Sequence, residues 1–207
     1  MSLPQYRLSL NGNWGIVDVD DVCSGAQWCV DQGYVNSQAL CIDGGSAGGY
    51  TTLAALAFHD IFKCGASLYG VADLTALASD THKFESRYLD ILIGKYPEDK
   101  SIYDERAPIN HIDKLSCPII LLQGDEDKIV PPNQAEMMYD ALTSKNIPAT
   151  LVLYEGEQHG FRMSYTVRHA LNSEYSFYCK IFGFDAQKEE DLEDVEIGER
   201  KEIEQQP

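Results

Sequence analysis

A glycine-rich run with a central serine, Gly44-Gly45-Ser46-Ala47-Gly48-Gly49, constrains the fold more than any other feature of this sequence. It follows a short apolar run at 39–43 and precedes a second apolar run at 51–58. The G-x-S-x-G spacing is typical of a sharp strand-to-helix turn that exposes the serine hydroxyl and needs small residues on either side. We therefore predict that Ser46 is a nucleophile. The backbone N–H of Ala47, at the start of the following helix, is then expected to stabilise a developing oxyanion.

Two other interpretations of this run compete with the nucleophile. A phosphate-binding loop requires a lysine after the glycines, and none follows them here. A tight turn with an incidental serine stays open as an alternative, although the placement between a strand and a helix favours the nucleophile.

Short apolar runs alternate with helix-like segments along the rest of the chain. Strands are expected at 39–43, 65–69, 118–123 and 149–154, and helices at 17–33, 51–58, 131–144 and 165–182. This alternation predicts an α/β fold, a mostly parallel sheet with helices on both faces. In the last helix, the helical period predicts that one apolar set faces inward: Ala170, Leu171, Tyr175, Tyr178 and Phe182.

A serine nucleophile needs a base, and the base needs an acid that orients it. In α/β folds with this turn, both follow the serine along the chain. Asp125, Glu126 and Asp127 come just after the strand expected at 118–123, and spacing alone does not choose among them. His159 lies in a glycine-flanked loop after the strand expected at 149–154, so we predict that it is the base. The remaining histidines lie on helices or in an irregular stretch: His59, His82, His111 and His169.

Three motifs occur in order, at 44–49, 124–134 and 159–161. They follow the pattern G-x-S-x-G-G, then G-x-x-D-x-x-V-P-x-x-Q, then H-G-F, which resembles the catalytic domain of the prolyl oligopeptidase family of serine peptidases. The likeness is greatest to its acylaminoacyl-peptidase and dipeptidyl-aminopeptidase-like branch, and it covers about 6–184. It implies an α/β-hydrolase type of fold, with Ser46 as nucleophile, Asp127 as acid and His159 as base. It also implies hydrolysis of short peptides through an acyl-enzyme, without a metal or an organic cofactor.

The sequence also departs from that family. Members have a β-propeller and an early His-Gly-Gly segment with its strands, all N-terminal to the part that resembles 11–15. We therefore expect an α/β-hydrolase domain at 1–185 that is truncated at its N-terminal side and lacks the second oxyanion donor. The strand at 39–43 would then be an exposed edge, a template for association. A homo-oligomer formed through this edge is the expected protein partner.

Two alternative functions follow from the same residues. A small cytosolic esterase or lactone hydrolase would use the same triad, but it predicts a complete N-terminal half. A catalytically weak fragment would keep the triad and need a partner to complete the sheet. For either enzyme, the expected small-molecule partner is a peptide or a small ester.

The charge and the cysteine pattern indicate which classes of binding partner and which cellular compartment to expect. The 207 residues carry 33 Asp plus Glu against 16 Lys plus Arg, a net charge of −17 that disfavours nucleic acids and anionic membranes. The six cysteines form no CxxC pair and no metal-ligand spacing, and the first residues do not resemble a signal peptide, so a cytoplasmic protein is expected. The segment 186–207 holds nine acids and three bases, and we expect a disordered acidic tail there.

Overall fold

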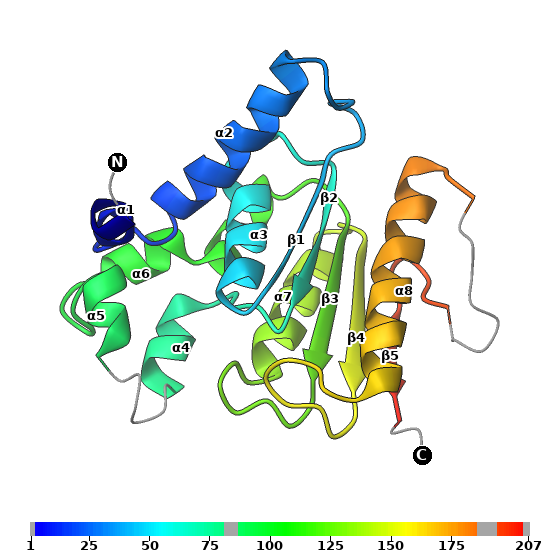
Figure 1. Ribbon diagram of the computed structural model, residues 1–207. Helices are drawn as coiled ribbons and strands as arrows, with labels where there is room; N and C mark the ends of the chain where they lie inside the picture. Colours follow the sequence, from blue (N-terminus) through cyan, green and yellow to red (C-terminus); the bar gives the residue numbers. More distant parts are fainter. Residues whose placement is uncertain (1–2, 81–86, 186–193, 205–207) are drawn as a thin grey trace.

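A parallel sheet runs through the middle of the molecule in the computed structural model, which describes residues 3–80, 87–185 and 194–204 (Figure 1). Its strands are β1 (Cys41–Gly45), β2 (Cys64–Leu68), β3 (Ile119–Gly124), β4 (Ala149–Tyr154) and β5 (Arg200–Ile203). They pair in the order β1-β2-β3-β4-β5, and every neighbouring pair is parallel. The predicted α/β fold is therefore confirmed, and all four predicted strands are present.

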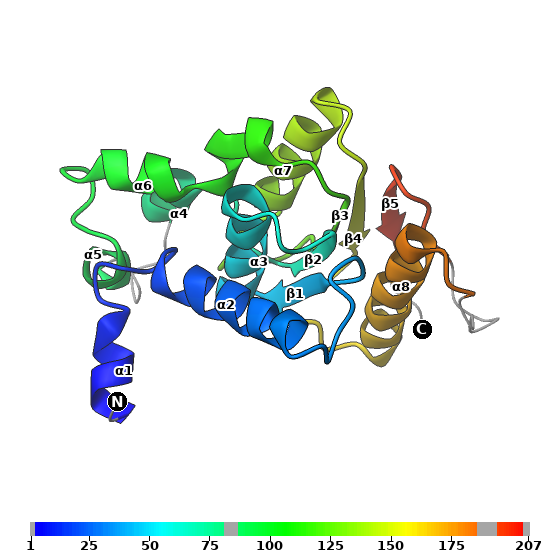
Figure 2. The ribbon, with the colours of Figure 1, turned by 90° about the horizontal axis from the view of Figure 1, so that it is seen from above.

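Helices cover both faces of this sheet. They are α1 (Leu3–Ser9), α2 (Val17–Asp31), α3 (Ala47–Phe58), α4 (Leu74–Asp80), α5 (Tyr88–Leu92), α6 (Lys100–Arg106), the 3-10 helix η1 (Pro108–Lys114), α7 (Asn133–Ser144) and α8 (Ser164–Phe182). Helices α3 and α7 share one hydrophobic core with one face of the sheet, whereas α8 packs in a second core on the opposite face (Figure 2). In the part of the chain that is described, no helix is long and apolar enough to span a membrane.

Helix α3 is buried along most of its length. Residues 52–57 are each at most 4% exposed. The helix lies close to the sheet because the facing strand has small residues. A Cβ on Gly65 of β2 would lie only 2.7 Å from Cδ1 of Leu56. At the start of the helix, a Cβ on Gly49 would lie 2.6 Å from Cα of Gly70, so the turn that carries Ser46 is also held close to its neighbours.

Strand β5 corrects the prediction of a disordered tail at 186–207. Residues 186–193 and 205–207 lie outside the described part, but 194–204 are ordered and contribute a strand that pairs with β4. Val195 and Ile203 are 1% and 5% exposed in the core beneath α8. Lys180 of α8 lies 3.1 Å from the carboxylate of Asp194. Lys180 also pairs with Glu196 at 3.0 Å, and Arg200 pairs with Glu136 of α7. Two apolar anchors and three ion pairs therefore order a segment whose composition is mostly charged.

Helix α8 buries only part of the predicted set. Ala170 is 3% exposed, and Tyr178 and Phe182 pack against the second core. Leu171 and Tyr175 are 64% and 46% exposed. Polar residues lie inside instead: His169 and Ser173 are fully buried, and His169 Nδ1 is 3.0 Å from the hydroxyl of Tyr154. The helical period missed these polar positions because the hydroxyls of Tyr154 and Ser173 both lie within hydrogen-bond distance of Nδ1 of His169, which lowers the cost of burying them.

Candidate active site

Ser46 lies at the turn between β1 and α3, the predicted strand-to-helix junction. Its backbone has φ 57° and ψ −119°, a conformation that is unfavourable for a non-glycine residue. The turn is so tight that a Cβ on Gly44 would lie 2.4 Å from the carbonyl oxygen of Gly48. Glycine is therefore required at position 44 by close backbone approach, and the strained turn presents the Ser46 side chain outward.

His159 connects the other two predicted residues of the site. Its Nε2 lies 2.7 Å from Oγ of Ser46, and its Nδ1 lies 2.8 Å from Oδ2 of Asp127. An ionised carboxylate can only accept hydrogen bonds. Nδ1–H therefore donates to Asp127, and Nε2 is left to accept the hydroxyl proton of Ser46.

The structure distinguishes among the three acids that follow β3. Asp127 is 3% exposed and contacts His159. Asp125 is exposed, and its carboxylate accepts a hydrogen bond from the backbone N–H of Gly156 at 2.7 Å. Glu126 is also exposed. Of these three, Asp127 has the geometry of an orienting acid.

The surroundings of Asp127 favour its ionised form. Burial raises the pKa of this carboxyl, but hydrogen bonds from His159 and from the backbone of Val130 and Ile129 outweigh it, so the pKa is lowered. Both backbone N–H groups donate to Oδ1, at 3.0 and 2.9 Å. The side-chain amide of buried Gln123 contributes a longer contact to Oδ2, at 3.4 Å.

None of the other described histidines lies in this arrangement. His59 is 3.4 Å from Asp20, His111 bonds to the backbone of Glu105, and His169 is a buried residue of α8. His82 lies outside the described residues. Within the described residues, no group of three or more His, Cys, Asp or Glu side chains is arranged to hold a metal ion.

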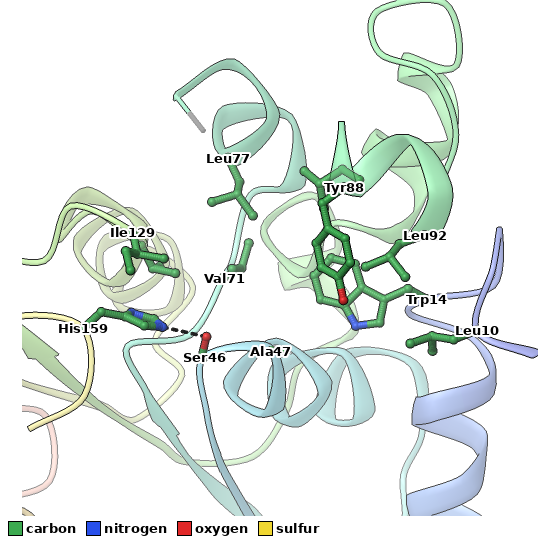
Figure 3. A pocket seen from close by; sticks show the side chains of 12 residues that line it. Leu10, Trp14, Ser46, Ala47, Val71, Leu77, Tyr88, Leu92, Ile129 and His159 are labelled. Atoms are coloured by element: carbon green, nitrogen blue, oxygen red, sulfur yellow. Dashed lines mark hydrogen bonds between the residues drawn. The ribbon is translucent and has the colours of Figure 1, made fainter. Parts of the chain in front are cut away.

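An apolar cavity of about 270 Å³ opens beside Ser46 (Figure 3). In this view Ile129 and His159 stand on one flank, and Trp14 and Tyr88 on the other. Twelve residues line it: Leu10, Trp14, Ser46, Ala47, Val71, Leu77, Tyr88, Leu89, Leu92, Ile129, Val130 and His159. Most of this wall was not identified from the sequence, because its residues come from segments far apart along the chain.

The segment before α2 forms the far wall of this cavity. The rings of Trp14 and Tyr50 pack with their centroids 4.4 Å apart. Arg106 of α6 donates hydrogen bonds to the carbonyls of Trp14 and Gly12, at 2.9 and 3.0 Å. These contacts hold Trp14 against α3, the helix that begins at the nucleophile.

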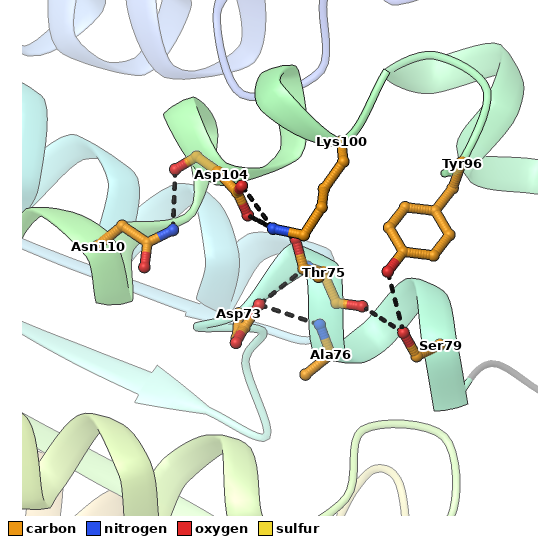
Figure 4. Close-up of polar contacts among 8 residues, drawn as sticks. All are labelled: Asp73, Thr75, Ala76, Ser79, Tyr96, Lys100, Asp104 and Asn110. Atoms are coloured by element: carbon orange, nitrogen blue, oxygen red, sulfur yellow. Dashed lines mark hydrogen bonds and ion pairs between the residues drawn. The ribbon is translucent and has the colours of Figure 1, made fainter. Parts of the chain in front are cut away.

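Helix α4 carries Leu77 into the wall, and polar contacts fix its position (Figure 4). At its start, Asp73 accepts hydrogen bonds from the backbone N–H of Thr75 and Ala76, at 2.8 and 3.0 Å. The hydroxyl of Thr75 donates to Asp104 of α6 at 2.9 Å. The helix is thus tied to α6 through polar groups, although it is too short to be stable alone.

Gln134 of α7 holds the turn between β2 and α4. Its Oε1 accepts hydrogen bonds from the backbone N–H of Ala72 and Asp73, at 2.9 and 2.7 Å, and its Nε2 donates to the carbonyl of Asp73 at 3.2 Å. The side chain is 1% exposed. Because Val71 of this turn lines the cavity, Gln134 connects the wall to the helix that follows the Asp127 loop. The sequence motif contains Gln134, but the motif alone gave it no role.

Comparisons with known proteins show what the chain is similar to. The profile of the prolyl oligopeptidase family matches residues 4–185. Dipeptidyl aminopeptidase BIII of Pseudoxanthomonas mexicana is 33% identical over 157 residues, which cover 73% of this chain and 23% of that protein. The acylamino-acid-releasing enzyme of Homo sapiens is 30% identical over 166 residues, which cover 73% of this chain and 22% of that protein.

Similarity extends to solved structures. A puromycin-hydrolyzing peptidase of Mycobacterium tuberculosis superimposes with a TM-score of 0.88 and 44% sequence identity. The match covers 93% of this chain and 29% of that one. The chain therefore spans less than a third of the length of each of these proteins.

Proposed function

Because the chain belongs to the prolyl oligopeptidase family of serine peptidases, as its three motifs predicted, we propose that it hydrolyses peptide bonds of short peptides through an acyl-enzyme on Ser46. The observation that carries the proposal is the position of His159, 2.7 Å from Oγ of Ser46 and 2.8 Å from the carboxylate of Asp127. A nucleophile, a base and an orienting acid in this geometry are what acyl transfer requires.

The proposed reaction proceeds in two halves. Oγ of Ser46 forms a bond to the carbonyl carbon while its proton passes to Nε2 of His159, and Asp127 stabilises the resulting imidazolium. The N–H of Ala47, in the first turn of α3, donates to the oxyanion. His159 then gives the proton to the leaving amine as the C–N bond breaks. A water molecule, activated by His159, hydrolyses the acyl-enzyme and restores the Ser46 hydroxyl.

The apolar cavity supports a preference at the residue whose carbonyl is attacked. It adjoins both Ser46 and Ala47, and its walls include Trp14, Leu77 and Leu92. Burying a large apolar side chain there stabilises the complex by roughly 1.5–3 kcal/mol, about a 10- to 150-fold preference over a small or charged side chain. The names of two relatives, a dipeptidyl aminopeptidase and an acylamino-acid-releasing enzyme, support a short substrate.

The test is hydrolysis of matched chromogenic substrates by the purified chain. N-acetyl-Phe p-nitroanilide is expected to react faster than its Asp counterpart, and Ser46→Ala is expected to lower kcat by at least about 10³-fold. Turnover of the Phe p-nitrophenyl ester but not of the anilide would assign the chain to the esterase alternative. Turnover of neither substrate, by a chain shown to be folded by circular dichroism, would favour the catalytically weak fragment.

A further inference from the structure

A second, smaller cavity borders the triad on the side of His159. It has a volume of about 210 Å³ and is lined by Glu126, Lys128, Ile129, Gln158, His159 and Arg162. Ile129 and His159 line the apolar cavity as well, on the flank opposite Trp14 and Tyr88 in Figure 3. These two side chains therefore form a wall that both cavities share, with Ser46 on the apolar side.

The lining of this cavity is cationic in a strongly acidic protein. The lining contains two cations, Lys128 and Arg162, and one acid, Glu126. With His159 neutral, its formal charge is +1, against −17 for the chain. Among the residues that the structure describes, neither cation forms an ion pair. Both charges are therefore available to a ligand.

Backbone hydrogen bonds fix the positions from which the two cationic side chains extend, in the same cavity lining as His159. Lys128 lies in the turn that Asp127 closes by accepting a hydrogen bond from the N–H of Ile129 at 2.9 Å. The N–H of Arg162 donates to both carboxylate oxygens of Glu157, at 3.1 and 2.9 Å, and Glu157 is 2% exposed. Although the side chains are exposed, their starting points are fixed relative to the triad.

The chemistry of acyl transfer indicates what occupies this cavity. His159 must protonate the leaving amine, so the leaving group lies beside His159 and away from the acyl side chain. The cavity is smaller than the roughly 300–1,000 Å³ of most ligand sites, which suits a leaving group of about one residue. On the basis of the proposed function, we propose that Lys128 and Arg162 bind the terminal carboxylate of a short leaving group, so that peptides with a free C-terminus close to the scissile bond are preferred.

The test measures binding in the Ser46→Ala variant, which does not turn over its ligand. Affinities of Gly-Phe-Ala and of the same tripeptide with a C-terminal amide are compared by calorimetry at low and high salt. The free acid is expected to bind roughly two- to fivefold more tightly, the size of an exposed ion pair. Raising the salt should reduce this ratio.

Variants assign the preference to the two cations. Adding Lys128→Gln together with Arg162→Gln is expected to bring the acid-to-amide ratio to about one, whereas Lys145→Gln, at the end of α7, is the matched control and should keep it. Equal affinity for acid and amide, a ratio that survives the double substitution, or no binding of either peptide would overturn the inference. Covalent labelling of Ser46 tests the proposed function separately, so a failure of one is distinguishable from a failure of the other.

Discussion

Nε2 of His159 lies 2.7 Å from Oγ of Ser46, although 113 residues separate them in the sequence. Ser46 directly follows β1, and His159 lies in the loop after β4, two strands that are not neighbours in the sheet. Their carboxyl ends lie at the same edge because every strand is parallel. The parallel sheet is thus what brings the two residues together.

Asp127→Asn tests the role proposed for the acid. The amide no longer balances an imidazolium and does not hold His159 in the required tautomer, so kcat is expected to fall by up to about 10⁴-fold. The measurement is the steady-state kcat on N-acetyl-Phe p-nitroanilide. Asp125→Asn is the matched control, because Asp125 is exposed and contacts Gly156 instead. A larger loss from Asp125→Asn than from Asp127→Asn would show that the assignment is wrong.

Gln134→Leu tests whether the wall of the apolar cavity depends on one buried amide. The substitution leaves the backbone N–H groups of Ala72 and Asp73 without their acceptor, so the free energy of unfolding should fall by roughly 1–3 kcal/mol. Because Val71 loses its support, KM for the Phe anilide should rise more than KM for the Ala anilide. Exposed Asn133→Leu, on the same helix, is the control. Lost stability with equal changes in the two KM values would mean that Gln134 has no effect on the cavity.

Titration of Glu174 is expected to make the free energy of unfolding depend on pH. Burial, with a smaller contribution from Asp43, raises the pKa of this carboxyl to about 7, although a hydrogen bond with Tyr178 opposes the shift. The folded state therefore binds this proton more tightly than the unfolded chain, so the contribution of Glu174 to stability is largest below pH 4.5 and is lost as the pH rises through about 7. Glu174→Gln is expected to remove this loss in urea unfolding between pH 5 and 8. A pH profile unchanged from the wild type, as is expected for exposed Glu98→Gln, would contradict it.

Because no other described strand pairs with the outer edge of β1, we expect the chain to self-associate through it. Among the described strands β1 is outermost, and Cys41 and Asp43 on it are exposed. Unpaired backbone groups on such an edge pair with another chain, and a lysine there opposes this pairing. We expect multi-angle light scattering to detect oligomers that Cys41→Lys weakens and Ser24→Lys, on α2, does not. A monomer at every concentration would refute the prediction.

Local patterns in the sequence predicted the frame of the site. The glycines around Ser46 were informative because close backbone approach leaves no room for a side chain at Gly44. The apolar runs identified the four strands β1 to β4 because buried parallel strands are apolar on both faces. Spacing did not choose among the acids after β3, because the choice depends on which carboxylate folds inward toward His159.

Features that depend on long-range packing were not predictable from these patterns. Strand β5 has one buried apolar residue, Ile203, and its pairing with β4 has no local signal. Two residues of the predicted inward face of α8, Leu171 and Tyr175, are exposed, whereas the polar side chains of His169 and Ser173 are buried and lie within hydrogen-bond distance of each other. The cavity walls come from α4, α5, the segment before α2 and the loops after β2 and β3, which meet only in the folded chain.

Reaction of Ser46 with a fluorophosphonate probe tests the central claim most directly, because the probe requires an activated serine and no knowledge of the substrate. The folded wild-type chain is expected to be labelled once, at Ser46, as identified by mass spectrometry of the modified peptide. Ser46→Ala should abolish labelling, and His159→Ala should slow it strongly because the base is lost. Equal labelling of wild type and Ser46→Ala, or no labelling of a folded wild-type chain, would contradict the proposed triad.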